Sequence, residues 1–231
     1  MLQNLNNLVV KKIAGKKFIF KNIYLGVLIL LVCFTTIKLS AQEDSYLQNG
    51  FNAIQNKNYK AAVENYSEAI KKASNYAPSY YGRGLAYYHL SSYDAAIRDF
   101  TKAIDLDANY FEAYYAKGIS LINTGKIGEA AVNFTSSLNI ANAYPEAYYA
   151  RGNANYLMKL YDKAIFDYNK SLELQPNFSL AVYGRAVSYK LMGNDKSALK
   201  DFYAYLDMAK DKDGLEKEVK RLISEIENPQ Q

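Results

Sequence analysis

The chain has 231 residues, of which 50% are apolar and 22% are charged, so it can bury a core and is too apolar to be a disordered tail. Its single cysteine, Cys33, excludes an internal disulfide, and its single histidine, His89, argues against a His/Cys metal site. The formal net charge of +5 would suit an acidic partner such as nucleic acid or a membrane surface. Tyrosine occurs 23 times and tryptophan never.

The first 41 residues have the pattern of a secretory signal. Five lysines lie between Lys11 and Lys21, and no acidic residue precedes Glu43. An apolar run follows over residues 23–37, and Leu39-Ser40-Ala41 places a small residue after it. A basic start, an apolar centre and a small residue at the end are typical of a signal peptide. We therefore predict a signal peptide over residues 1–41, cleaved after Ala41.

The alternative is an uncleaved signal anchor, in which residues 23–37 hold the protein at the inner membrane. This run is shorter than the roughly 20 apolar residues that a membrane-spanning helix needs, and Lys38 closes it. Cys33 is read as an ordinary apolar residue of the run rather than a lipoprotein cysteine. The sequence Leu31-Val32-Cys33 lacks the small residue expected just before such a cysteine.

Placing the charges changes their meaning. Residues 1–41 hold six of the 28 basic residues and none of the 23 acidic ones, so the remainder is nearly neutral. The basic balance therefore belongs to the targeting segment. We expect no nucleic-acid partner, and contact with a membrane only through an uncleaved N-terminal segment.

The rest of the chain repeats with a period of 34 residues. Four glycines mark the period, and an alanine follows each period mark by 12 residues. These positions are Gly50, Gly84, Gly118 and Gly152, then Ala62, Ala96, Ala130, Ala164 and Ala198. An aromatic residue lies four positions after each alanine, as at Tyr66, Phe100, Phe134, Tyr168 and Phe202. Five units therefore tile residues 43–76, 77–110, 111–144, 145–178 and 179–212.

This pattern resembles the tetratricopeptide repeat, in which an aromatic, a glycine and a tyrosine on one helix are followed by Ala-x-x-x-Phe on a second. The resemblance covers residues 43–212, although tyrosine stands where the family pattern has tryptophan and the late proline occurs only as Pro176. It implies an all-α fold: a right-handed α-solenoid of five helix-turn-helix units. Helical spacing of the apolar residues supports the same conclusion independently of the family.

Boundary residues can also be assigned. Ser92, Asn58 and Asn194 are candidate N-caps of second helices, and Gly125 and Gly193 are candidate terminators of first helices. Asn75, Asn109 and Asn177 near the unit ends suggest left-handed turns. An apolar stripe between Leu215 and Ile226 predicts a C-terminal capping helix over residues 213–227, followed by a frayed tail over residues 228–231.

Basic and acidic residues vary together at two positions of the repeat. Arg83, Arg151 and Arg185 are followed 16 residues later by Asp99, Asp167 and Asp201. Where the first position is Lys117, the second is Asn133. We predict Arg–Asp ion pairs between the two helices of a unit, with a structural role rather than a catalytic one.

The resemblance implies a ligand-binding concave groove lined by the first helix of each unit. The positions that should face it are Tyr81, Leu85, Tyr88, Tyr115, Ile119, Ile122, Tyr149, Tyr156 and Tyr183. Tyrosine offers a large area and a polar tip, which suits recognition, but these rings could instead pack between neighbouring helices. Glu112 and Glu146 at the groove edge would repel a carboxylate terminus. We expect an extended peptide or a helix with apolar and basic side chains.

No set of residues converges into a catalytic centre, and His89 is expected to be a surface residue. We therefore predict a non-catalytic interaction scaffold without a cofactor or metal. It would be exported to the periplasm or secreted, and its partner would be a protein or peptide. Two alternatives remain open. One is a receptor for a small ligand or glycan that stacks on the tyrosines, and the other is a structural subunit of an envelope complex that uses the convex face.

Overall fold

The computed structural model describes residues 45–209 and 214–228, whose regular elements are all helices. The predicted signal peptide and signal anchor lie outside these residues. Residues 45–55 are helical and are followed by α2 (Tyr59–Lys72), α3 (Ala77–His89), α4 (Tyr93–Leu106), α5 (Phe111–Asn123), α6 (Ile127–Ile140), α7 (Pro145–Leu157), α8 (Tyr161–Leu174), α9 (Ser179–Leu191), α10 (Asp195–Ala209) and α11 (Glu216–Glu227). Within this part of the chain, no helix has the length and apolar character to cross a bilayer.

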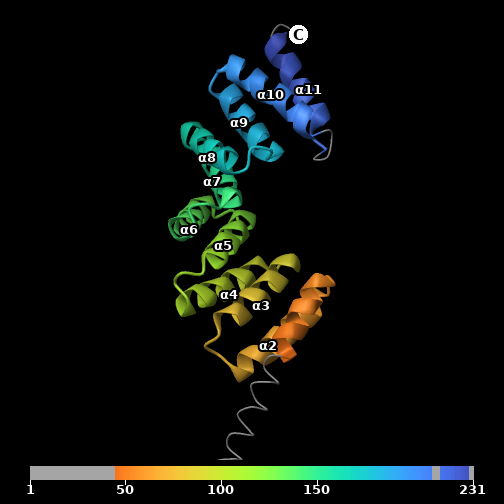
Figure 1. Cartoon of the computed structure of the whole chain (residues 1–231), viewed down its shortest axis with the longest axis vertical. Helices are drawn as coiled ribbons and strands as arrows, with labels where there is room; N and C mark the ends of the chain where they lie inside the picture. The colour runs from red at the N-terminus through yellow and green to blue at the C-terminus, as the bar shows by residue number, and fades with distance from the viewer. Residues whose placement is uncertain (1–44, 210–213, 229–231) are drawn as a thin grey trace, which may run out of the picture.

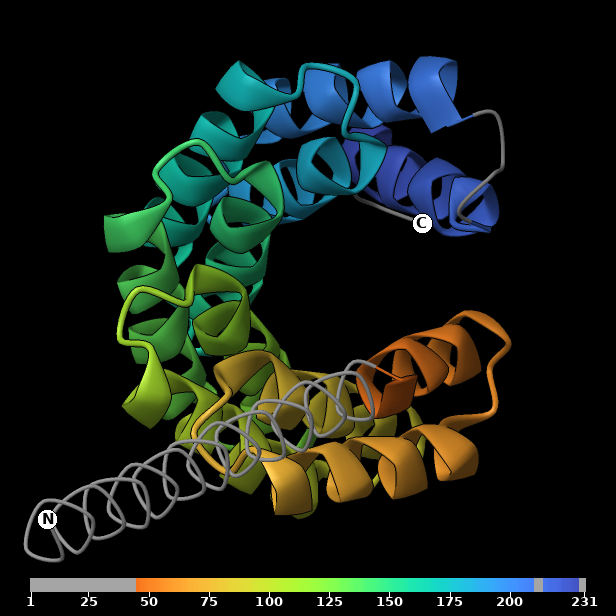
Figure 2. The same ribbon diagram turned by 60° about the horizontal axis from the view of Figure 1, so that its bottom comes forward.

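The helices pack in consecutive pairs and the pairs stack along the molecule (Figure 1). The result is an all-α, right-handed solenoid that curves into an open ring (Figure 2). Residues 45–55 and α9 lie on the inside of the ring, whereas α2 and α10 lie on its outside (Figure 2). The first helix of each pair therefore faces the concave side, as the repeat pattern implied.

Each pair is held by an aromatic ring that fills the space beside a small residue. A side chain added at Gly84 would lie 2.7 Å from the Phe100 ring, and one added at Gly118 would lie 2.5 Å from the Phe134 ring. The alanines at the next repeat position, Ala62 to Ala198, are fully buried. Small residues let the two helices approach closely, and the ring supplies most of the buried apolar area.

A second set of small residues correlates with the aromatic type, which the sequence analysis did not note. Sixteen residues after Tyr66 and Tyr168 the next unit has Gly82 and Gly184. Sixteen residues after Phe100 and Phe134 it has alanine, at Ala116 and Ala150. A Cβ at Gly82 would lie 2.3 Å from Tyr66 Cζ, and one at Gly184 would lie 2.9 Å from the Tyr168 hydroxyl oxygen. The longer tyrosine therefore requires glycine across the junction between units.

The first helices end in a left-handed residue at one repeat position. Besides Gly125 and Gly193, the residues with positive φ at this position are Lys57, Ser91 and Lys159. Asn58 and Asn194 accept backbone N–H bonds from the next helix, at 3.2 Å each.

Two expectations about the boundary residues are corrected. The side chain of Ser92 makes no cap hydrogen bond. Asn75, Asn109 and Asn177 are not left-handed, because the described non-glycine residues with positive φ are Lys57, Ser91 and Lys159. The turns between units are closed instead by local hydrogen bonds such as that from the Asn109 backbone N–H to Asp107 Oδ1.

The helix α11 covers the end of the solenoid. Val219, Leu222 and Ile223 are buried in one cluster with residues of α9 and α10. Lys190 Nζ lies 2.9 Å from Glu225 Oε2, and the Tyr203 hydroxyl donates to Glu227. This helix therefore buries the apolar face that the last repeat would otherwise expose.

One buried polar group in the core has no partner. Ser79 is 1% exposed and its Oγ makes no hydrogen bond. The corresponding residues of the next three units are Ala113, Ala147 and Ala181. Replacing Ser79 with alanine is expected to raise the free energy of unfolding by about 1–2 kcal/mol, because an unsatisfied buried hydroxyl is removed.

Urea denaturation of the full chain measures this effect. Ser120 is the matched control, since it is equally buried but its Oγ donates to the Ala116 carbonyl at 2.9 Å. Ser120→Ala should give no gain in stability. A Ser79→Ala variant no more stable than the native chain would contradict the expectation.

Candidate functional site

The three predicted Arg–Asp pairs are brought together between the helices of their units. Nε and one terminal nitrogen of each guanidinium donate to the two carboxylate oxygens, in a bidentate arrangement. The N–O distances are 2.7 and 2.8 Å for Arg83–Asp99, 3.0 and 2.7 Å for Arg151–Asp167, and 2.7 and 2.8 Å for Arg185–Asp201. The hydrogen bond to Asp99 raises the pKa of Arg83 further.

The same arginines also reach back to the preceding unit, which the sequence analysis missed. Nη1 of Arg83 donates to Ser67 and that of Arg151 to Thr135, both at 3.1 Å. Nη1 of Arg185 donates to Asn169 at 2.6 Å. Each acceptor lies 16 residues before its arginine, the same spacing that separates the arginine from its aspartate. Each arginine therefore joins three helices of two neighbouring units.

The third unit interrupts this arrangement. Among the described residues Lys117 makes no ion pair, and Asn133 Nδ2 donates to the Glu129 carbonyl at 2.9 Å. The chain thus contains its own comparison between a unit with the pair and one without it.

The tyrosine row on the inner face is largely a packing device. Tyr81 lies 5.8 Å from Phe100 and 4.9 Å from Tyr110, measured between ring centroids. Tyr115 and Tyr149 repeat this arrangement one and two units later. These rings are half-buried, so only part of each faces the groove.

The groove tyrosines remain protonated over a wide pH range. Burial, followed by the charge of Glu112, raises the pKa of Tyr81 to about 12. Burial, followed by the charge of Glu146, raises the pKa of Tyr115 to about 12. Both phenols therefore stay neutral hydrogen-bond donors near acidic side chains at neutral pH.

A pocket of about 260 Å³ lies on the inner face between α7 and α9. It is lined by Tyr149, Asn153, Tyr156, Tyr168, Leu180, Tyr183, Gly184 and Val187. Three of the predicted groove residues, Tyr149, Tyr156 and Tyr183, meet here. The others lie half-buried on α3 (Tyr81, Leu85, Tyr88) and α5 (Tyr115, Ile119, Ile122), outside this pocket.

Asn153 supplies the polar group of this pocket, and it was not among the predicted site residues. Its Oδ1 accepts a hydrogen bond from the Tyr168 hydroxyl at 2.8 Å. No hydrogen bond from its Nδ2 to another described residue is present, so this amide can donate to a bound molecule. The other first helices carry apolar residues at this position, namely Phe51, Leu85, Ile119 and Val187. That contrast was the available signal.

His89 lies in an aromatic cluster rather than a catalytic one. Its ring stacks on Tyr59 at 4.5 Å and meets the edge of Tyr88 at 5.5 Å. Within residues 45–209 and 214–228, no three His, Cys, Asp or Glu side chains are grouped so that they could hold a metal ion.

The fold and the repeated helix pairs define a helical-repeat solenoid. The tetratricopeptide repeat model matches residues 77–110 and 145–178, the second and fourth predicted units. The chain therefore carries tetratricopeptide repeats.

Solved structures share the fold at low sequence identity. MamA 41-end from Desulfovibrio magneticus RS-1 is 22% identical with a TM-score of 0.69, over 74% of this chain and 97% of that one. YrrB, described as a TPR protein with an unusual peptide-binding site, is 22% identical with a TM-score of 0.64, over 72% and 86%. TTC0263, a thermophilic TPR protein from Thermus thermophilus, is 17% identical with a TM-score of 0.60, over 78% and 97%. No curated protein matched the sequence.

Proposed function

We propose that this chain is a non-catalytic binding protein whose concave groove takes an extended segment or a helix of a protein partner. The observation that carries the proposal is the inner pocket, where three tyrosines of the predicted row meet the amide of Asn153. Tyrosine rings offer area at low entropic cost, and a free amide can bind a peptide carbonyl. A peptide-binding site named for YrrB, which has the same fold, is consistent with this use.

The chemistry of the groove indicates the kind of segment. The lining of the inner pocket carries no formal charge, so an apolar or aromatic side chain suits it. Glu112 and Glu146 act on the neighbouring tyrosines, which places negative charge along the groove. Basic residues flanking the apolar anchor would complement that charge. A terminal carboxylate would be disfavoured there.

The binding test compares Tyr156→Ala with Tyr203→Ala. Tyr156 lines the pocket, whereas Tyr203 is an exposed tyrosine on α10 outside it. Proteins captured by the full chain from envelope extract should lose at least tenfold in affinity with Tyr156→Ala and be unaffected by Tyr203→Ala, with thermal unfolding unchanged in both. Partners that bind Tyr156→Ala as well as the native chain would refute the groove. A glycan array addresses the receptor alternative, and glycan binding lost in the same variant would favour it.

We also propose that the protein acts outside the cytoplasm, in the periplasm or as a secreted protein. The basis is the basic, apolar and small-residue order of residues 1–41. N-terminal sequencing of the protein from its native source should read Gln42-Glu43. An intact N-terminus in the membrane fraction would instead support the anchor over residues 23–37.

A further inference from the structure

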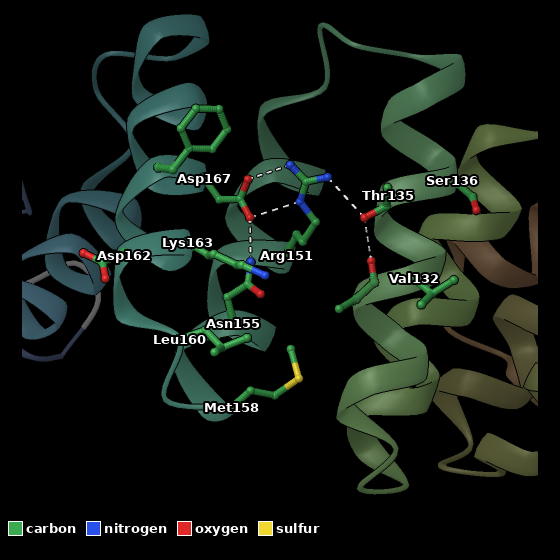
Figure 3. Close-up of a pocket in the computed structure, with 12 residues that line it drawn as sticks. Val132, Thr135, Ser136, Arg151, Asn155, Met158, Leu160, Asp162, Lys163 and Asp167 are labelled. Carbon is green, nitrogen blue, oxygen red and sulfur yellow. Dashed lines mark hydrogen bonds and ion pairs between the residues drawn. The ribbon is translucent and has the colours of Figure 1, made fainter.

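A larger pocket lies on the other side of the solenoid from the tyrosine groove. It has a volume of about 640 Å³ and is lined by α6 and α8 with α7 at its floor (Figure 3). Val132, Met158, Leu160 and Phe166 provide apolar walls, and the ion pair of Arg151 with Asp167 lies at the floor. This volume lies within the range of ordinary ligand pockets.

The rim of this outer pocket is apolar where the other units are charged. Val132 occupies the repeat position that is Glu64 in the first unit and Arg98 in the second. Ser136 likewise replaces Glu68 and Lys102. Val132 is 65% exposed and Phe166 is 56% exposed. Two large apolar side chains therefore face solvent at one junction of an otherwise charged outer face.

The floor is hollow because small residues replace large ones. Asn155 stands where other units have Tyr87, Leu121 and Tyr189. Ala131 stands where they have Val63, Ile97 and Ile165. These two substitutions open the space that the neighbouring junctions fill with side chains.

The hollow contains one unmatched acceptor and no unmatched charge at its floor. Asn155 is 8% exposed and its Nδ2 donates to Asp167 Oδ2 at 2.9 Å. Its Oδ1 has no hydrogen-bond donor among the described residues and is turned away from Asp167 (Figure 3). The carboxylate of Asp167 is satisfied by Arg151 and Asn155 together. A buried carbonyl facing an apolar hollow favours an occupant that brings an N–H donor.

We propose that the outer pocket binds an exposed tryptophan side chain of a partner protein. An indole has a large apolar body for the walls, no charge and a single N–H donor for Asn155 Oδ1. The thioether of Met158 is a favourable neighbour for an aromatic ring. The chain has no tryptophan of its own, so a second copy cannot supply one. The occupant therefore comes from a different protein, and this site is independent of the concave groove.

The test titrates the full, isotope-labelled chain with N-acetyltryptophanamide and follows amide shifts by NMR. Shifts are expected at Ala131, Val132 and Phe166, with a dissociation constant on the order of 1 mM for so small a probe. The N1-methyl analogue, which has no indole N–H, should bind at least fivefold more weakly. N-acetylleucinamide should cause no saturable shift in these residues.

Two variants complete the test. Val132→Arg introduces the residue type that the second unit carries at Arg98, so the fold is expected to tolerate it, and it should abolish the shifts. Leu174→Arg is the matched control, because Leu174 is an exposed residue of α8 outside the pocket. Tyr156→Ala on the concave side should leave the shifts unchanged, which separates this site from the proposed groove. Equal binding of the methylated or leucine probe, or shifts that persist in Val132→Arg, would overturn the proposal.

Discussion

Replacing Asp167 with alanine is expected to lower the free energy of unfolding by about 3–5 kcal/mol. The carboxylate is 2% exposed and accepts hydrogen bonds from Arg151 and Asn155. Its removal leaves a largely buried guanidinium and a buried amide without their acceptor, which is the costly case for an ion pair. Because Arg151 also binds Thr135, the loss is felt at the junction between two units. Urea denaturation of the full chain measures it.

The third unit supplies the control for this prediction. Lys117 occupies the arginine position without an ion-pair partner among the described residues, so Lys117→Ala should cost less than about 0.5 kcal/mol. The double variant Lys117→Arg with Asn133→Asp should rebuild the pair and be more stable than either single variant. Equal losses for Asp167→Ala and Lys117→Ala would show that the pairs do not hold the units together.

The helical repeat was predictable because its signal is local and recurs five times. A glycine, an alanine and an aromatic residue at fixed offsets specify how two helices meet, and the same contact occurs at Gly84–Phe100 and Gly118–Phe134. The Arg–Asp pairs were predictable for the same reason, since residues that vary together across units indicate contact. Caps were less predictable, because Ser92 competes with backbone bonds in its turn and leaves its side chain unused.

The pockets were not predictable from the repeat, because they arise where the repeat is broken. Asn153 and Asn155 each replace an apolar or aromatic residue of the other units, and they lie on opposite sides of α7. A rule that describes the average unit treats both as exceptions. The tyrosine row shows the converse limit. Its positions were predicted, yet only the contacts of Tyr81 and Tyr115 with neighbouring rings reveal how much of each ring is used in packing.

Replacing Gly184 with alanine is expected to cost about 1–3 kcal/mol of unfolding free energy, because the added Cβ overlaps the Tyr168 ring. The Cβ would lie 2.7 Å from Tyr168 Cζ and 2.9 Å from its hydroxyl oxygen. The ring cannot easily withdraw, since that hydroxyl donates to Asn153. In contrast, Gly128→Ala should stabilise the chain by about 0.5–1 kcal/mol, because a Cβ on this helical glycine would meet nothing within 4 Å.

The native chain shows which second change should relieve this overlap. Phe100 packs with Ala116, and Phe134 packs with Ala150, each in one buried cluster. Tyr168→Phe alone should cost about 1 kcal/mol through the lost hydrogen bond. Combined with Gly184→Ala, it reproduces the Phe–Ala combination, so the double variant should be at least about 1 kcal/mol more stable than the sum of the single losses predicts. Strict additivity would mean that the hydroxyl does not determine the residue across the junction, and that the pairing of tyrosine with glycine has another cause.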